Sequence, residues 1–150
     1  MLAGFAHCSE AAVEHYIDKV SGDIDHLPAD EQEGQIEIAM GKACTKLGAD
    51  RHAGQLENHY SVLGQVYVQV GKDLSAVSTV IGTGGVIISN ETPEEILAGI
   101  LYETASPHIL KPKQPNFTVD KSYILAAMGL LAEDYPDTAV RMMKKYIVGG

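Results

Sequence analysis

The chain has 150 residues, of which 45% are hydrophobic and 21% charged, so it has the size and composition of one folded domain. Its net charge of −9 and pI near 5.0, with the few basic residues scattered, exclude a protein that binds nucleic acid through the phosphate backbone. The apolar runs are too short to cross a bilayer and no secretory signal begins the chain, so we expect no membrane partner.

Acidic residues concentrate in the first third of the chain. From Glu10 to Glu37, nine carboxylates stand against the single Lys19. A solvated surface is the favoured interpretation, and a docking face for a basic partner is the alternative.

The two cysteines, Cys8 and Cys44, are too few and too far apart for a disulfide framework, and neither belongs to a CxxC pair. We predict that each is a small buried hydrophobic residue in a reducing compartment, which favours a cytoplasmic location.

Two helices are predicted before residue 50. Ser9 can cap the first helix, which Gly22 ends, and its apolar positions recur at spacings of three and four: Val13, Tyr16, Ile17 and Val20. A loop follows over residues 23–29. The second helix is predicted from about Asp30 to Leu47, with Gly48 as its stop signal and one apolar stripe: Ile36, Met40, Cys44 and Leu47.

Strand patterns begin after Asp50. Residues 64–71 alternate apolar and polar side chains between two glycines, which is typical of a half-buried strand. The β-branched run of residues 77–81 then leads directly into the glycine-rich turn Gly82-Thr83-Gly84-Gly85.

A third helix is predicted from Thr92, which can act as its cap, with Pro93 in the first turn and Glu95 completing a capping box. Its expected buried face is Ile96, Leu97, Ile100 and Leu101. Residues 106–116 contain three prolines and two lysines and are predicted to be a surface connection.

Two more helices are predicted near the end of the chain. Asp120 or Thr118 begins one that is apolar on most sides over residues 123–132 and is therefore expected to be buried. The last begins near Pro136 and is expected to turn Val140, Met143 and Ile147 inward. Together the patterns predict a helix-rich mixed α/β fold in a single domain, residues 1–150, helical over 1–50 and carrying the strands and the glycine turn over 51–150.

The glycine turn, residues 82–85, is the strongest candidate site. A strand that ends in Gly-Thr-Gly-Gly allows positive φ and the close approach of a ligand, most simply a nucleotide. It is neither a Walker A loop nor a GxGxxG fingerprint. The same residues would also serve a tight turn where two core elements touch, and both interpretations stay open.

Two polar clusters are weaker candidates. Arg51 could bind a phosphate or carboxylate with His52 as a polar contact, although structural hydrogen bonds at a helix end are the favoured alternative. Lys72 and Asp73 lie in a turn and could reach a ligand or be ordinary surface residues. No metal-ligand spacing, Ser-His-Asp or Cys-His arrangement, GxSxG motif, or Asp-x-His-x-x-Gly cobalamin loop is present, and no catalytic or metal residue is predicted.

Three segments in this order and spacing resemble one family. They are residues 51–54, residues 71–74 running into 80–85, and residues 120–131. They resemble the C-terminal part of the glutamate mutase-associated MutL-type proteins, which are unrelated to the mismatch-repair protein of that name. The resemblance covers about residues 30–148 and is less distinct over the first helix.

The resemblance implies a function. Members of that family accompany adenosylcobalamin-dependent mutases and aminomutases, belong to the actin/Hsp70/sugar-kinase ATPase superfamily, and are thought to be reactivating chaperones. It implies ATP or ADP with Mg²⁺ as cofactors of the complete protein and mutase subunits as partners. The residues assigned to the adenosine side are Gly82, Thr83, Gly84, Gly85, Arg51, His52, Lys72 and Asp73.

The chain also departs from the superfamily pattern. The Asp-x-Gly-Ser/Thr phosphate hairpin and the second acidic phosphate motif are absent from this sequence. The chain is therefore expected to be part of an ATPase lobe that binds the adenosine end weakly, does not hydrolyse ATP alone, and self-associates through surface that the missing lobe would cover. A protein–protein adaptor without a nucleotide role and a fragment of a sugar or acid kinase are the alternatives.

Overall fold

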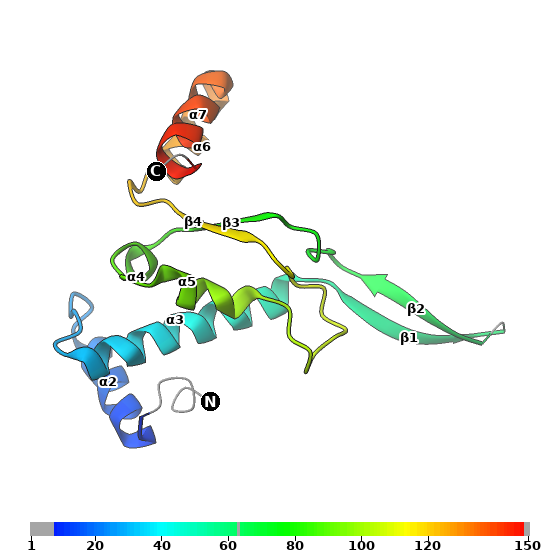
Figure 1. The fold of residues 1–150 in the computed structure, drawn as a ribbon, viewed down its shortest axis with the longest axis horizontal. Helices are drawn as coiled ribbons and strands as arrows, with labels where there is room; N and C mark the ends of the chain where they lie inside the picture. Colours follow the sequence, from blue (N-terminus) through cyan, green and yellow to red (C-terminus); the bar gives the residue numbers. More distant parts are fainter. Residues whose placement is uncertain (1–7, 63, 149–150) are drawn as a thin grey trace.

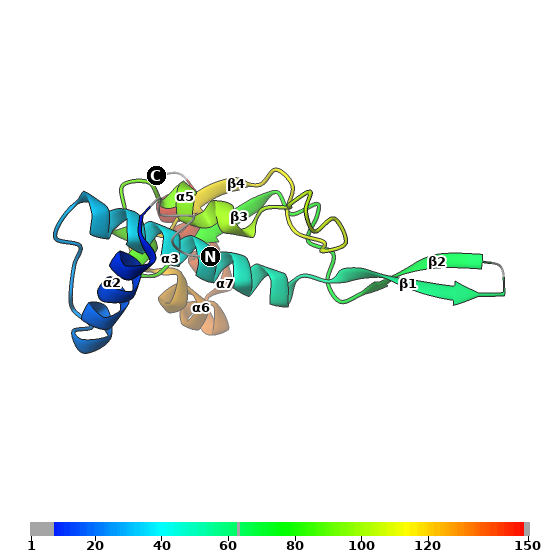
Figure 2. The ribbon, with the colours of Figure 1, turned by 90° about the horizontal axis from the view of Figure 1, so that it is seen from below.

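The computed structural model describes residues 8–62 and 64–148 and confirms a helix-rich mixed α/β fold. Its centre is the long helix α3 (Glu31–His52), with α2 (Glu10–Gly22) packed against one end. A two-stranded hairpin extends away from the other end of α3 (Figures 1 and 2), and a pair of helices near the C-terminus stands apart from the body (Figure 1).

The predicted cap of the first helix is confirmed, and the second helix begins with a cap at Asp30, close to its predicted start. The Ser9 side chain accepts a hydrogen bond from the backbone N–H of Ala12, and the Asp30 carboxylate accepts one from Glu33. These caps satisfy N–H groups that would otherwise lack partners in the first turn. The two helices bury a small core between them, made of Val13, Tyr16, Ile36 and Ala39.

The predicted end of the second helix is wrong, and its predicted apolar stripe is buried only at Ile36. α3 continues past Gly48 to His52, because a helical glycine costs only about 1 kcal/mol and packing along the helix outweighs this. Its buried residues are Ile36, Ala39 and Ala43, whereas Cys44 and Leu47 are exposed. Small side chains face the neighbouring elements because those elements approach α3 closely. Cys8 is half-buried, so neither cysteine is the fully buried residue that was predicted.

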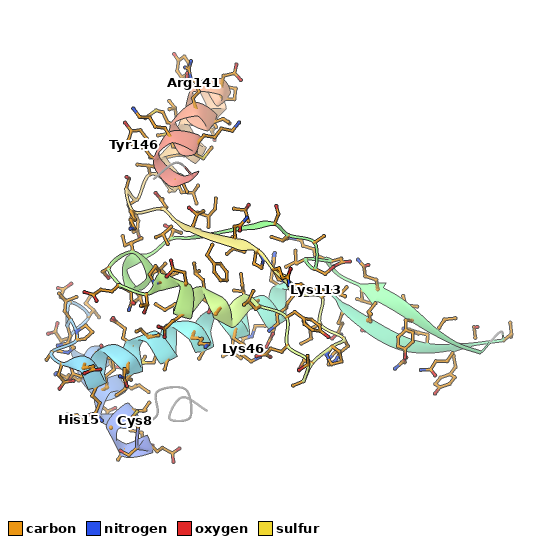
Figure 3. The ribbon with its side chains drawn as sticks, in the orientation of Figure 1. Cys8, His15, Lys46, Lys113, Arg141 and Tyr146 are labelled. Atoms are coloured by element: carbon orange, nitrogen blue, oxygen red, sulfur yellow. The ribbon has the colours of Figure 1, made fainter. Side chains whose placement is uncertain are left out.

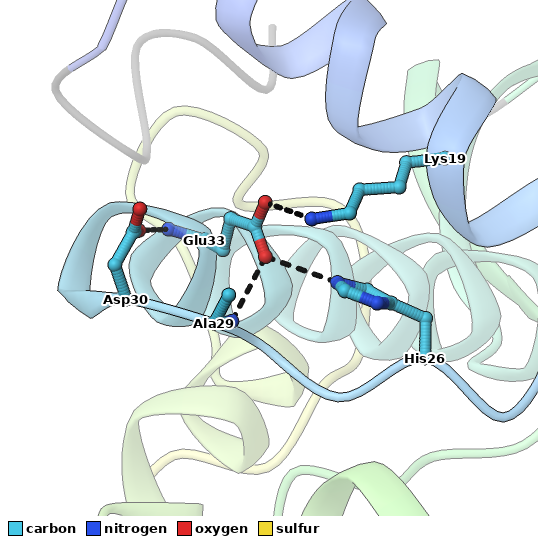
Figure 4. A network of polar contacts seen from close by, with 5 residues as sticks. All are labelled: Lys19, His26, Ala29, Asp30 and Glu33. Carbon is cyan, nitrogen blue, oxygen red and sulfur yellow. Dashed lines mark hydrogen bonds and ion pairs between the residues drawn. The ribbon is translucent and has the colours of Figure 1, made fainter.

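Glu33 links α2, the following loop and α3 (Figure 4). One carboxylate oxygen accepts from Lys19 Nζ at 2.7 Å, and the other accepts from the Ala29 N–H at 2.9 Å and lies 3.0 Å from His26 Nε2. The hydrogen bonds from Lys19, Ala29 and His26 lower the pKa of Glu33 from 4.5 to about 2. The ionised Glu33 carboxylate is therefore more stable in the folded chain, where it has these partners, than in the unfolded chain.

This network predicts a specific acid sensitivity. Because the pKa of Glu33 is depressed on folding, its contribution to stability is complete above pH 4.5 and is lost as the pH falls from there to about 2. We expect Glu33→Gln to reduce the loss of stability between pH 5 and pH 2, measured as the denaturation midpoint at each pH. Glu31→Gln, at an exposed carboxyl on the same helical turn, is the control and should change the pH profile less than Glu33→Gln does. Identical profiles for wild type and Glu33→Gln would contradict this role.

The hairpin consists of β1 (Gln55–Ser61) and β2 (Gly64–Val70), paired antiparallel with Gln55 opposite Val70. The predicted strand at residues 64–71 is thus confirmed, but its predicted half-burial is wrong, because all residues of β2 are exposed on a hairpin that extends into solvent. Its partner β1 carries no clear alternation and was not predicted. Gly54 and Gly71 cross at the base of the hairpin, where a Cβ on Gly54 would lie 2.6 Å from the Gly71 carbonyl carbon. Only glycine permits this approach, and α3 therefore ends just before it.

A second small sheet carries the glycine turn. β3 (Thr79–Gly82) pairs in parallel with β4 (Asn116–Val119), with Gly82 opposite Val119. The short helices α4 (Gly85–Ile88) and α5 (Pro93–Leu97) follow β3, and the 3-10 turn η1 (Ala98–Ile100) continues α5.

The predicted capping box at Thr92 does not form. The Thr92 hydroxyl bonds the Asn90 side chain at 3.2 Å, and α5 has only five residues. Ile96 and Leu97 are buried as predicted, whereas Ile100 and Leu101 are half-buried. Residues 106–116 are not simply a surface connection, because Lys111 and Pro112 are buried within it.

The C-terminal helices are α6 (Leu125–Asp134) and α7 (Pro136–Met143), followed by the π-helical turn η2 (Lys144–Val148). The buried Asp120 carboxylate accepts hydrogen bonds from the N–H groups of Ile124 and Leu125, so it caps the start of α6 as its sequence position suggested. The burial of α6 was predicted wrongly, because Leu130 is 73% exposed.

α7 also differs from its predicted orientation. Ala139 is buried in place of Val140, which is exposed; Met143 is half-buried and Ile147 is buried. The helices pack on each other and stand away from the rest of the chain, with Arg141 and Tyr146 on this outlying unit (Figure 3). Part of the apolar pattern of these helices, including Leu130 and Val140, therefore faces solvent instead of a core.

Candidate functional site

A cavity of about 460 Å³ lies beside the glycine turn, which is within the range of small-molecule pockets. α2 and the loop after it form one side, the middle of α3 forms the base, and the turn between β3 and α4 forms the other side. The lining is largely apolar, with Val20, Ile24, Met40, Cys44, Ile87 and Ile96 among its residues.

The glycines of the turn have different roles. Gly82 is buried, and a Cβ there would lie 2.9 Å from Ile87 Cγ2 and 3.0 Å from Leu97 Cδ1, so this glycine is required by packing. Gly84 has φ +104°, which favours glycine, and no atom outside its chain neighbours lies within 4 Å of its Cβ position. Gly85 also faces open space but without a positive φ. Thr83, Gly84 and Gly85 line the cavity.

Two acidic groups from the helices supply polar atoms to the cavity. Tyr16 is 2% exposed, and its hydroxyl has no hydrogen-bond partner among the described residues. Burial, with repulsion from Glu37 and Glu33, raises the pKa of Tyr16. Burial also raises the pKa of Glu37, although attraction to His26 partly opposes this. A buried hydroxyl without a partner is costly, so the cavity has an unused hydrogen-bonding group.

The charge of the cavity limits what it can bind. Glu37 and His26 are its ionisable side chains beside Tyr16 and Cys44, and none of the described residues that line it is Lys or Arg. Such a site suits an uncharged planar or ribose-like group that exchanges hydrogen bonds with a carboxyl, a phenol and backbone atoms. It does not suit a triphosphate, which needs cations or several converging N–H groups.

Tyr16 and Glu37 were not predicted as site residues. Tyr16 was assigned to the buried face of its helix, and its burial is confirmed, but sequence periodicity does not show whether a hydroxyl finds a partner. Glu37 was counted among the acidic residues of a solvated surface. Its place beside the glycine turn follows from the packing of segments about 45 residues apart in the chain.

The other predicted site residues lie elsewhere. Arg51 and His52 end α3, and Arg51 lies six residues beyond Thr45, the last α3 residue of the cavity, which is about 9 Å along the helix axis. Lys72 lies at the base of the hairpin with its Nζ 3.5 Å from His52 Nε2. Asp73 accepts a hydrogen bond from the Ser75 N–H at 2.9 Å, and hydrogen bonds from the Ser75 side chain and backbone lower its pKa.

Apart from Gly82, which packs against Ile87 and Leu97, the structure groups the predicted residues into two sets. Thr83, Gly84 and Gly85 belong to the cavity, whereas the four residues at the end of α3 and the base of the hairpin do not line it. The second set would contact a ligand in this cavity only if that ligand, or a further part of the protein, extended along α3.

A buried charge network that the sequence did not reveal lies between these two sets. Lys111 is 0% exposed, and its Nζ lies 2.8 Å from Asp50 Oδ1 and 3.7 Å from Glu103 Oε2. Lys46 joins it by ion pairs to Asp50, at 3.5 Å, and to Glu103; Figure 3 labels Lys46 on α3. Burial alone would raise the pKa of Asp50, but Lys111 and Lys46 outweigh this and hold it below its usual value. The network fastens α3 to the segment that returns toward β4.

Two further properties concern the described part of the chain. Within residues 8–62 and 64–148, no cluster of three or more His, Cys, Asp or Glu side chains is arranged to hold a metal ion. Over the same residues, no helix has the length and apolar character needed to span a membrane.

Comparison with known proteins identifies the family. Residues 2–147 match the family described as MutL protein. The chain belongs to this MutL family. The match confirms the resemblance shown by the motifs and extends it over the first helix. The Protein MutL of Clostridium tetanomorphum is 48% identical over 122 residues, which are 81% of this chain and 26% of that protein. The chain thus spans about a quarter of the length of this relative. No solved structure matches.

Proposed function

We propose that this MutL-family chain binds the adenosine end of ATP or ADP in the cavity beside the glycine turn, as part of a reactivating factor for an adenosylcobalamin-dependent mutase or aminomutase. The observation that carries the nucleotide proposal is the meeting of Thr83, Gly84 and Gly85 with the unpartnered Tyr16 hydroxyl in one apolar cavity. The link to a mutase rests on the family resemblance.

The chemistry of the lining fits an adenine base. Apolar side chains from α3 and α4 would cover the faces of the ring, and Glu37 and the Tyr16 hydroxyl would bond its polar edge. The open space at Gly84 and Gly85 allows a ribose to approach the backbone. Since no Lys or Arg lines the described cavity, the phosphates would point away from it.

In this proposal the phosphates, Mg²⁺ and the hydrolytic step belong to the remainder of the longer protein. The chain itself would then bind the adenosine part, which ATP and ADP share. It would therefore bind both nucleotides with similar, weak affinity. In the complete protein, hydrolysis would change the angle between lobes and so the affinity for the mutase. The acidic surface of α2 and the start of α3 is the proposed contact with the mutase.

Calorimetric titration of the 150-residue chain with ATP and with ADP tests the nucleotide proposal. We expect dissociation constants on the order of 1 mM or tighter, equal for the two nucleotides within about threefold. If neither nucleotide gave a heat of binding at millimolar concentration, the proposed nucleotide site would be contradicted.

Two variants make this titration specific. Gly85→Val places a side chain in open space at the cavity without needing a positive φ, so it should fold normally and weaken binding at least about tenfold. Gly129→Val, at an exposed glycine of α6 with nothing within 4 Å, is the matched control and should bind as wild type does. Tyr16→Phe removes a hydroxyl that has no described partner, so it should spare folding and weaken binding by about tenfold. Equal binding by all three variants would exclude this cavity.

An adaptor without a nucleotide role is the second candidate. The contacts of Gly82 with Ile87 and Leu97 favour it, because packing alone explains that glycine. They do not explain the open positions at Gly84 and Gly85. The family match gives no support to a fragment of a sugar or acid kinase.

A further inference from the structure

The outer edge of β2 is an unused pairing surface. The hairpin extends into solvent from the end of α3 (Figures 1 and 2), and all seven residues of β2 are exposed. β1 pairs with one edge of β2, and no other described segment pairs with its second edge. By contrast, the edge of β1 near the body is covered, because the Leu56 N–H donates to the His108 carbonyl at 2.8 Å.

This edge lacks the features that usually protect an edge strand. β2 reads Gly-Gln-Val-Tyr-Val-Gln-Val and contains no charged residue, no proline and no bulge relative to β1. Natural proteins guard a free edge with such features because unpaired N–H and C=O groups recruit another strand. An isolated two-stranded hairpin is also only marginally stable in water, and added strands stabilise it.

The sequence of β2 matches itself in the antiparallel direction. Residues 65–69, Gln-Val-Tyr-Val-Gln, read the same in both directions around Tyr67. If two copies of β2 pair antiparallel about Tyr67, each residue from 65 to 69 faces its own type: Gln65 faces Gln69, Val66 faces Val68, and Tyr67 faces Tyr67. At the two ends of the pairing, Gly64 faces Val70. Paired β-branched and aromatic side chains stabilise antiparallel strands, and a two-fold interface requires such self-complementarity.

We propose that β2 pairs antiparallel with β2 of a second copy of the chain, about a two-fold axis at Tyr67. The product is a four-stranded sheet in the order β1-β2-β2-β1. Because side chains alternate along a strand, the valines at 66, 68 and 70 of both copies form one apolar patch on one face. The opposite face joins Leu56, Tyr60 and Tyr67 with the amide side chains of Asn58, Gln65 and Gln69, and contains no charge.

Charge also favours a second copy at this place. Each chain carries a net charge of −9, so two copies repel each other over most of their surfaces. In the hairpin the ionisable side chains of known placement are Glu57, His59 and the two tyrosines, and Glu57 and His59 lie on β1, 3.4 Å apart. The β2 edge therefore brings two acidic chains together without opposing like charges. This inference does not depend on the nucleotide proposal, since the cavity lies toward the other end of α3.

Sedimentation velocity with charge variants at the axis tests this pairing. We expect the wild-type chain to form a concentration-dependent dimer. Tyr67→Lys would place two lysines opposite each other and weaken the dimer about 100-fold. Tyr60→Lys is the matched control, because Tyr60 is on the same face, is 85% exposed against 67% for Tyr67, and lies on β1 away from the axis. It should dimerise as wild type does.

A mixing experiment then fixes the register. Tyr67→Glu should be as monomeric as Tyr67→Lys, and an equimolar mixture of the two should regain a heterodimer because the lysine of one copy faces the glutamate of the other. In a Cys8→Ala, Cys44→Ala background, Tyr67→Cys should oxidise to a covalent dimer, since directly opposed residues have Cα atoms about 4.5–5.5 Å apart, within disulfide range. Tyr60→Cys should not.

Several outcomes would overturn the proposal. The first is a wild-type chain that stays monomeric at about 100 μM or above, a concentration at which even a weak interface is populated. The second is a dimer that Tyr67→Lys does not weaken. The third is a mixture of the lysine and glutamate variants that stays monomeric. Circular dichroism of each variant shows whether a monomeric variant is still folded. If Tyr67→Lys does not fold, Tyr67→Arg takes its place in the sedimentation and mixing experiments.

Discussion

Replacing Lys111 with methionine is expected to lower the free energy of unfolding by about 3 kcal/mol, which is a large share of the stability of a domain of this size. The Lys111 side chain is fully buried, and its Nζ lies 2.8 Å from Asp50 Oδ1, an atom with no other described hydrogen-bond donor. Methionine keeps the apolar stem but leaves the Asp50 and Glu103 carboxylates with Lys46 as their remaining cation. The cost comes from the carboxylate that is left partly buried without its partner.

Chemical denaturation followed by circular dichroism measures this loss. Lys113→Met is the control, because Lys113 is two residues away in the same segment but exposed, with its Nζ 5.7 Å from the Tyr102 ring. Its loss should be below about 1 kcal/mol. Equal effects of the two substitutions would show that the network does not hold the returning segment on α3. The double variant Lys111→Met, Asp50→Leu should recover part of the stability, since it removes the unpaired charge as well.

Replacing Gly99 with alanine is the second change with a large expected effect. A Cβ on Gly99 would press into the Lys42 carbonyl oxygen and the Thr45 hydroxyl, and would lie 3.0 Å from the Lys46 nitrogen. Two of these three atoms are backbone atoms of α3 and cannot rotate away. The Thr45 hydroxyl also donates to the Ile96 carbonyl at 2.7 Å, so moving it breaks a bond between α3 and α5. We expect a loss of about 3 kcal/mol.

Gly48→Ala provides a control with the opposite sign. Gly48 lies within α3 and has nothing within 4 Å of its Cβ position, so alanine should stabilise the helix by up to about 1 kcal/mol. Thermal unfolding of the two variants side by side compares them directly. A stability for Gly99→Ala within 0.5 kcal/mol of wild type, on the order of an ordinary surface substitution, would mean that η1 does not contact α3 as closely as described.

Several local signals of the sequence were reliable, although the capping box at Thr92 was not. Ser9 and Asp30 cap helices because a short polar side chain reaches the free N–H groups of the first turn, and this depends on neighbours in sequence alone. The same is true of Asp120 before α6. Gly48 misled because a glycine ends a helix only if nothing outweighs its modest cost, and the contacts that outweigh it come from distant residues.

Burial was harder to predict than secondary structure. Cys44, Leu130 and Val140 have apolar side chains at helical spacing, yet all three are exposed. Periodicity shows which side chains share a face, but only the neighbouring element decides whether that face is covered. Lys111 is the converse, because a lysine between prolines looks like a surface residue until Asp50 and Glu103 are brought beside it.

The candidate site was half predictable. Gly84 and Gly85 were recognisable because a run of glycines after a β-branched strand has few uses. Tyr16 and Glu37 were not, because they join the turn only when α2 and α3 fold across it. Arg51, His52, Lys72 and Asp73 were assigned from the family resemblance and remain predicted nucleotide-side residues, although they lie outside the cavity.

A backbone hydrogen bond between Asp120 and Gly82 connects the outlying helices α6 and α7 to the glycine turn beside the cavity. The Asp120 N–H donates to the Gly82 carbonyl at 2.9 Å, while the Asp120 carboxylate holds the first turn of α6. At the other end of the helical unit, the Thr118 hydroxyl donates to the Ile147 carbonyl at 2.7 Å. The helical unit is therefore attached to the rest of the chain at two points, Thr118 on β4 and Asp120 just after β4. Asp120 thus joins the first turn of α6 to the Gly82 carbonyl, one residue before Thr83 and Gly84 of the cavity.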